Sequence, residues 1–257
     1  MSLDIGPILE GWPPGEGANA RKIVGDDGQE KMQLRVVIEG LHGIVQFNCD
    51  GRPDGKRPHA REFALDHYED LARARRGTDA DSFRLSRRQA AELFEESAMT
   101  YQRYVLLLQM NDYDRVIRDT ERNMRLFRFV HACAARAEDR DNLEKWWPYI
   151  LRLHWTARAL KRLEEESFDA ASACVAEGRK AIVELAPQEN DVFQAEMKRS
   201  IEALDDLDRT IGEHRPLSEV DELERDKEEA IRAEDYERAA QLRDRIVELR
   251  KGPAPPE

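Results

Sequence analysis

Cysteine is scarce in this sequence, and its few copies are widely separated. Cys49, Cys133 and Cys174 are the three cysteines of the 257 residues, and no Cys-x-x-Cys pair occurs. A zinc knuckle needs closely spaced thiols and a disulfide framework needs an even set, so neither is predicted. Free, scattered cysteines are typical of a reducing compartment, and we expect a cytoplasmic protein.

Long apolar runs are also missing. No segment of 18 consecutive apolar residues is present, and the first 17 residues lack the basic start and apolar stretch of a signal peptide. We therefore expect neither secretion nor a membrane-spanning helix, and no membrane partner.

Sequence signatures of catalysis are absent as well. The six histidines never pair at a spacing of four, and no Gly-x-Ser-x-Gly or Gly-Lys-Ser/Thr phosphate loop occurs. The Asp- and Gly-rich turns at 24–28 and 50–55 lack the spaced ligands of a calcium loop. We expect no enzyme activity, no cofactor and no metal site. The alternative is an active site assembled from residues that no local motif reveals.

Aromatic residues make up only 7% of the chain, whereas charged residues make up 37%, with many Ala, Glu, Arg and Leu. This composition is typical of a mainly α protein. The net charge of −12 is concentrated in residues 89–257, which hold 27 basic and 38 acidic groups. An acidic helical portion repels a phosphate backbone, so nucleic acid is an unlikely partner.

Apolar periodicity and turn residues divide the chain into five predicted parts. They are a flexible arm at 1–20, a small β-hairpin plus helix region at 21–82, an α-helical hairpin domain at 83–212, a second helical hairpin at 217–251, and a tail at 252–257. Within the first three parts, helices are predicted at 61–76, 86–110, 113–137, 147–163, 168–185 and 192–211. Trp12 in the arm is expected to cover part of the body.

The β-hairpin is predicted from alternation. Met32, Leu34, Val36 and Ile38 fall on one face of residues 31–38, which is the period of a half-buried strand. Residues 44–49 supply a second strand, and residues 39–43 a connecting loop. Two strands alone are not stable in water, so this hairpin has to pack on the helices or on another strand.

Three turns between predicted helices resemble one another. Each has an apolar residue, a gap of five, and then an aromatic residue followed by an acid, and the aromatic residues are Tyr113, Phe168 and Tyr236. We expect each aromatic residue to open the second helix of a hairpin and to wedge against the end of the first. The sequence thus predicts three helical hairpins, with only a loose likeness to tetratricopeptide repeats.

The last predicted hairpin carries a specific pattern. Its diagnostic positions are Leu223, Ala230, Tyr236-Glu237, Ala239-Ala240, Leu242-Arg243-Asp244, Ile246 and Leu249, and Asp235 can cap its second helix. This stretch of about 35 residues resembles the UVR motif, the helical hairpin named for the excision-nuclease subunits UvrB and UvrC. Lys227, Ile231 and Glu234 depart from that pattern.

The resemblance implies contact between proteins rather than chemistry. UVR hairpins pair with another UVR hairpin or dock on a partner in repair nucleases and in regulators of Clp-type proteases. The implied partner is therefore another UVR-containing protein or a second copy of this chain. The partner-binding residues would be Leu223, Ala230, Tyr236, Ala239, Leu242, Arg243, Ile246 and Leu249. Ordinary alanine-rich helix packing is the alternative interpretation.

Two further segments leave alternatives open. Residues 52–88 hold ten basic groups, which indicate either a phosphate-binding patch for an excision-repair accessory or a solvated face in which acids alternate with bases. Residues 146–155 hold Trp146, Trp147, Tyr149 and Trp155, which could form an aromatic pocket for a peptide or base, or fill the gap between helices. The main hypothesis is a non-catalytic interaction protein.

Overall fold

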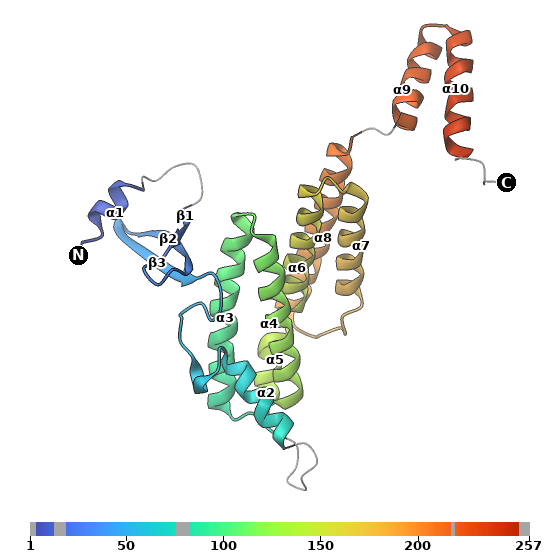
Figure 1. The fold of residues 1–257 in the computed structure, drawn as a ribbon. Coiled ribbons are helices and arrows are strands. Elements are labelled where there is room, and N and C mark those ends of the chain that lie inside the picture. Colours follow the sequence, from blue (N-terminus) through green and yellow to red (C-terminus); the bar gives the residue numbers. More distant parts are fainter. Residues whose placement is uncertain (1–3, 13–18, 76–82, 217–218, 252–257) are drawn as a thin grey trace, which may run out of the picture. The chain divides into compact units, whose positions relative to one another are not determined.

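The structure is a computed structural model that describes residues 4–12, 19–75, 83–216 and 219–251. The chain divides into two compact units, Met1–Arg209 and Thr210–Glu257. Helices dominate both units, which confirms the mainly α class (Figure 1). The end of the predicted 21–82 region, from residue 76 on, and the tail at 252–257 lie outside the described residues. No helix in the described parts of the chain is long and apolar enough to cross a membrane.

The N-terminal strands form a three-stranded antiparallel sheet in the order β1-β2-β3. The predicted hairpin consists of β2 (Glu30–Ile38) and β3 (Leu41–Asn48). An additional strand, β1 (Ala20–Val24), pairs with β2 from Ala20↔Leu34 to Val24↔Glu30. Sequence periodicity missed β1 because five residues with two adjacent bases give no clear alternation, so pairing with β2 rather than local pattern defines it.

The loop between β2 and β3 is shorter than predicted. Only Glu39 and Gly40 lie outside the strands, both at positive φ (50° and 84°), and Ile38 pairs with Leu41. A two-residue loop with two positive φ values matches the right-handed twist of the strands. The predicted loop residues 41–43 therefore belong to β3.

The sheet packs on the hairpin of α3 (Arg87–Gln109) and α4 (Tyr113–Cys133). The shared core contains Met32, Phe47, Cys49, Tyr104, Leu107, Tyr113, Val116 and Ala157. Ion pairs tie the two elements together at the surface, with Lys22 Nζ 2.5 Å from Asp112 Oδ2 and Arg115 Nη1 2.6 Å from Glu30 Oε2. The expectation that the β-hairpin packs on the helices or on another strand is confirmed, and here it does both.

A buried carboxylate positions the next helix, α2 (Ala64–Ala74), which follows a short 3-10 turn, η1 (Pro58–Ala60). Glu96 of α3 is 1% exposed, and its Oε2 and Oε1 accept hydrogen bonds from the backbone N–H groups of Ala64 (2.7 Å) and Leu65 (3.2 Å). A carboxylate at a helix N-terminus satisfies free N–H donors and favours the helix dipole. α2 therefore begins three residues later than periodicity predicted, at the point where Glu96 caps it.

In the N-terminal arm, the structure contains a short helix, α1 (Gly6–Glu10). The guanidinium of Arg21 on β1 lies 4.3 Å from the centre of the Trp12 ring, so Trp12 lies against the sheet.

The helix predicted at 113–137 ends four residues early in the structure, and a helix that was not predicted follows it. α4 ends at Cys133, because Ala134 is extended and forms a parallel bridge with Leu85. A separate helix, α5 (Ala137–Glu144), follows and leads into α6 (Trp147–Glu164). The break depends on the backbone of residue 85, which no local pattern at 134 can reveal.

Glycine permits close packing in the hairpin of α6 and α7 (Phe168–Val183). A Cβ atom at Gly178 would lie 2.5 Å from the Cβ atom of Trp155. Such a contact is impossible for any larger residue, so Gly178 sets the distance between the two helices. α8 (Asp191–His214) follows, with Phe193 and Leu204 fully buried and Asp205 bonded to Arg179 of α7 (2.9 Å).

The three similar turns share one backbone geometry. Asn111, Glu166 and Glu234 have φ values of 56°, 54° and 59°, and the next N–H bonds to a carbonyl five residues earlier, from Asp112 to Leu107, Ser167 to Arg162 and Asp235 to Ala230. This pattern is the Schellman motif that ends a helix. Each aromatic residue is then the first residue of α4, α7 or α10, as predicted, but the expected wedge against the preceding helix is wrong for Tyr236, which is 68% exposed.

Candidate interaction hairpin

The second unit contains a helical hairpin of α9 (Glu219–Arg232) and α10 (Tyr236–Lys251). The chain reverses within three residues, and the side chain of Asp235 accepts a hydrogen bond from the N–H of Arg238 (3.0 Å). Asp235 is therefore the N-cap that the sequence predicts for α10. This hairpin is confirmed by the structure.

Small and branched side chains close the hairpin. Ala230, Ala239 and Ile246 are 5%, 8% and 4% exposed, respectively, and Leu223, Leu242 and Leu249 are half-buried. Ion pairs cross from one helix to the other, between Arg250 Nη2 and Glu224 Oε1 (2.7 Å) and between Arg245 Nη2 and Glu219 Oε1 (3.6 Å). Ala230 and Ala239 are small enough to let the two backbones approach, which explains the alanines at these two positions of the pattern.

A second stripe on α10 is turned away from this seam. Tyr236, Ala240, Arg243 and Val247 follow one another at spacings of four, three and four, so they share one side of the helix. Tyr236 is 68% exposed and Val247 44% exposed, and Ile231 at the end of α9 is 48% exposed. The hairpin thus carries large apolar side chains that its own fold does not bury.

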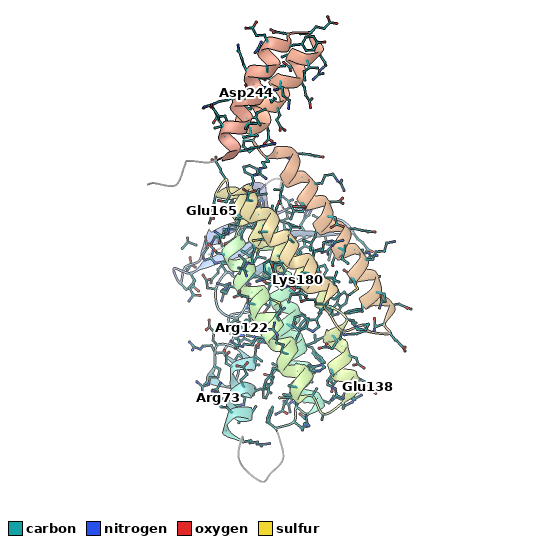
Figure 2. The ribbon with its side chains drawn as sticks, turned by 90° about the vertical axis from the view of Figure 1, so that its right-hand side faces the viewer. Arg73, Arg122, Glu138, Glu165, Lys180 and Asp244 are labelled. Atoms are coloured by element: carbon teal, nitrogen blue, oxygen red, sulfur yellow. The ribbon has the colours of Figure 1, made fainter. Side chains whose placement is uncertain are left out.

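The two helices differ in charge. α9 carries seven acidic and three basic residues, whereas α10 carries three acidic and five basic residues. Figure 2 shows the hairpin with Asp244, one of the few acids of α10, labelled. The guanidinium of Arg243 bonds to this neighbouring acid at 2.7 Å. An acidic helix beside a basic one makes a surface that can complement a second hairpin of the same kind.

The eight predicted partner-binding residues therefore fall into two groups. Six of them, Leu223, Ala230, Ala239, Leu242, Ile246 and Leu249, are buried or half-buried in the hairpin, and Tyr236 and Arg243 lie on the exposed stripe. Sequence analysis did not include Val247 among the partner-binding residues. Val247 follows Tyr236 by eleven residues, which is about three helical turns, so helical periodicity could have predicted that the two share one face.

Four of the basic groups that the structure describes in residues 52–88 pair with acids, namely Arg52, Lys56, Arg61 and Arg73. Arg52 is 8% exposed and bonds to Glu96 (3.0 Å), while Arg61 and Arg73 both bond to Asp70 at 2.7 Å. The guanidinium of Arg84 donates to the carbonyl of Ala132 (3.0 Å). These contacts favour the interpretation of this segment as a solvated face, in which acids alternate with bases, over that of a phosphate-binding patch.

The aromatic residues of 146–155 separate into two roles. The Trp147 ring packs edge-on against Phe127 (5.4 Å between centroids), and Trp155 packs against Gly178, as expected for core residues. Trp146 and Tyr149 instead line a cavity of about 550 Å³ in the larger unit. Gap filling therefore holds for Trp147 and Trp155, whereas Trp146 and Tyr149 line a cavity, and binding of a peptide or base there stays a prediction.

Buried polar groups in the larger unit mainly support its structure. Arg103 forms a bidentate ion pair with Asp119 (2.7 and 2.9 Å), and its guanidinium also donates to the backbone carbonyls of Asn48 and Gly51. Burial lowers the pKa of His154 to about 4, and its Nδ1 lies 2.9 Å from Thr120 Oγ1. Among the described residues, no group of three or more His, Cys, Asp and Glu side chains could hold a metal ion.

Comparison with known proteins gives one match. No curated protein and no solved structure matches the chain. Residues 218–252 match the family model described as the UvrB/uvrC motif, and these residues include α9 and α10. This motif is linked in general to excision-repair and Clp-related proteins. The chain therefore carries a UVR motif at its C-terminus, in the second of its two compact units.

Proposed function

We propose that this chain is a non-catalytic interaction protein that docks through its α9–α10 hairpin on another UVR-type hairpin. A second copy of the chain is the first partner to test. The observation that carries the proposal is the exposed stripe of Tyr236, Arg243 and Val247 within the matched motif. Covering these exposed side chains with a partner's apolar surface lowers the free energy of the complex, because it removes apolar surface from water.

Charge supports a second copy as the partner. In a two-fold symmetric pair, the same surface meets itself, so a basic α10 can face the acidic α9 of the other copy in both halves of the interface. Attraction across such an interface steers association and fixes its orientation. Pairing of like helices would instead bring five basic residues against five.

The size of the hairpin also supports docking. Two helices of 14 and 16 residues give a small core, and helices of this length are marginal alone in water. A partner that buries the outer stripe would stabilise the helices by mass action. Excision repair and regulation of Clp-type proteases are the two settings in which partners with matching hairpins should be sought first.

Sedimentation velocity of the full chain tests self-association. We expect a concentration-dependent dimer that the double change Tyr236→Ser and Val247→Glu abolishes, because a buried carboxylate without a partner is costly. These positions are chosen because Leu242 is half-buried and Ile246 is 4% exposed, so charges there would open the hairpin itself. Val183→Glu on α7 is the matched control, since Val183 is also exposed (58%).

The outcomes separate the possible partners. If the wild-type chain is monomeric at all concentrations yet binds a separate UVR hairpin, the second copy is the wrong partner but the docking role stands. If it binds neither, or if the double change leaves the dimer intact, the proposed docking surface is wrong.

Direct nucleic-acid binding through residues 52–88 is the alternative function. The ion pairs of Arg52, Arg61 and Arg73 with acids argue against it, because a phosphate would have to displace those acids. Titration of the full chain with duplex DNA at roughly physiological salt should show weak or no binding. Sub-micromolar affinity with a steep salt dependence would instead favour the alternative.

A further inference from the structure

The larger unit contains a cavity that the proposed docking role does not use. It measures about 550 Å³, a size suited to a small organic molecule. Its walls come from α3, α4, α5 and the start of α6, with one side chain from α8. Aromatic rings make up much of the lining, contributed by Phe94, Tyr101, Tyr104, Phe127, Trp146 and Tyr149.

Three pairs of aromatic rings that line the cavity pack edge-to-face against one another. Tyr101 lies edge-to-face with Tyr104 (5.6 Å between centroids) and with Tyr149 (5.8 Å), and Trp146 does the same with Tyr149 (6.5 Å). Tyr101 and Trp146 are 42% and 39% exposed, so they mark the rim. Lys145 Nζ and the Arg152 guanidinium lie over the Trp146 and Tyr149 rings (5.7 and 4.9 Å to the centroids), so rings at this rim already attract cations through their negative π faces.

One polar atom on the cavity wall has no partner. Asn123 is 1% exposed, and its Nδ2 donates to the carbonyl of Ser97 (3.0 Å), while its Oδ1 accepts no hydrogen bond. An amide oxygen in place of Nδ2 would be repelled by the Ser97 carbonyl oxygen, which fixes the orientation of the amide. A buried acceptor left alone is unfavourable by roughly 1–3 kcal/mol, so Oδ1 is a place for a ligand donor.

A carboxylate completes the wall. Glu196 of α8 is 8% exposed, and its Oε1 accepts a hydrogen bond from Arg199 (2.9 Å), which is itself largely exposed. An adjoining hollow shares Phe94 and Asn142 with the cavity and carries Glu138, Asp139 and Asp141 beside one lysine. Glu138 is labelled in Figure 2, on α5. The charged groups that line the wall and the hollow are therefore four carboxylates and one lysine.

We propose that this cavity binds an organic ammonium, a protonated amine carried on a flat apolar body. The rings attract the cation and cover the apolar body, Glu196 supplies the opposite charge, and Asn123 Oδ1 accepts an N–H. A carboxylate ligand would be repelled by Glu196, and a purely apolar ligand would leave Oδ1 without a partner. This inference is independent of the hairpin.

Calorimetric titration of the full chain with three probes tests the inference. Benzylamine, benzyl alcohol and benzoate share one ring and differ in the charge of the head group at neutral pH. We expect benzylamine to bind at least about tenfold more tightly than benzyl alcohol, and benzoate not to bind, because the cation alone satisfies both Glu196 and Asn123.

Variants assign the effect to the cavity. Glu196→Gln keeps the shape of the side chain and should weaken benzylamine at least about tenfold while leaving benzyl alcohol unchanged. Glu202→Gln, an exposed acid on the same helix, is the matched control and should change neither. Tyr101→Ala at the rim should weaken both probes, and it serves as a second test if Glu196→Gln fails to fold.

Three results would overturn the inference. They are the absence of benzylamine binding at millimolar concentration, equal affinity for benzylamine and benzyl alcohol, and a folded Glu196→Gln protein that binds benzylamine as tightly as the wild type.

Discussion

The α3–α4 and α9–α10 hairpins reverse direction by the same turn but use its aromatic residue differently. Tyr113 is 8% exposed and belongs to the core shared with the sheet, whereas Tyr236 is 68% exposed. Both follow a positive-φ residue and a capping aspartate, Asp112 or Asp235. The turn is thus coded locally, but the neighbours outside the hairpin decide whether the aromatic residue stabilises the fold or stays available to a partner.

The ion pairs of the two regions allow the largest test of this comparison. Arg103 and Asp119 are each 1% exposed, whereas Arg250 and Glu224 form a pair with exposed fractions of 62% and 38%. Asp119→Ala should destabilise the chain by roughly 3–5 kcal/mol, because it leaves a buried guanidinium without its partner. Glu224→Ala should change the free energy of unfolding by less than about 1 kcal/mol. Urea denaturation measures both, and similar effects would contradict the comparison.

The aromatic residues give the next test. Tyr113→Ala should lower the free energy of unfolding by about 3 kcal/mol, since it removes a buried ring from the core beneath the sheet. Tyr236→Ala should lower it by less than about 0.5 kcal/mol in a monomeric sample, because an exposed ring loses little contact. Thermal melts at low protein concentration compare the two. A large loss of stability in the Tyr236 variant would show that the ring is covered within the monomer.

The pH dependence of folding stability provides a third test, because protonation of His154 should destabilise the larger unit at low pH. Burial lowers its pKa in the folded state to about 4, from 6.5, so the unfolded chain binds more protons between these values. Stability should therefore fall as pH falls, by about 2 kcal/mol between about pH 7 and pH 4.5 from this residue. Denaturant titrations of His154→Gln should show a shallower fall. His131→Gln, at an exposed histidine, is the control, and an equal change in both variants would rule out His154 as the cause.

The smallest test concerns the turn itself. Glu234 adopts a φ of 59°, a conformation that a residue with a Cβ adopts at a cost, whereas Asn111 in the equivalent turn tolerates it better. Glu234→Gly should stabilise the α9–α10 hairpin by about 0.5–1 kcal/mol. Hydrogen exchange of the α10 amides measures this change, and the protection of α3 should not change. Faster exchange in α10 would mean that the Glu234 side chain contributes a contact.

Much of the fold was accessible from the sequence because helices and caps are local. The apolar spacing predicted α3, α6, α7, α8 and the C-terminal hairpin to within a few residues, and Asp235 was identified as a cap. β1 and the break before α5 were missed, because both depend on hydrogen bonds to distant strands or residues rather than on neighbouring residues.

The candidate surfaces divide in the same way. The sequence alone determined that a UVR hairpin stands at residues 217–251 and that its alanines and leucines follow a helical period, since a period of 3.6 residues can be read from the residues themselves. Only the tertiary structure decided that Ile246 closes the hairpin while Tyr236 stays exposed, and that Asn123 and Glu196, 73 positions apart, line one cavity. Exposure and proximity depend on which helices pack together, and that is a property of the whole chain.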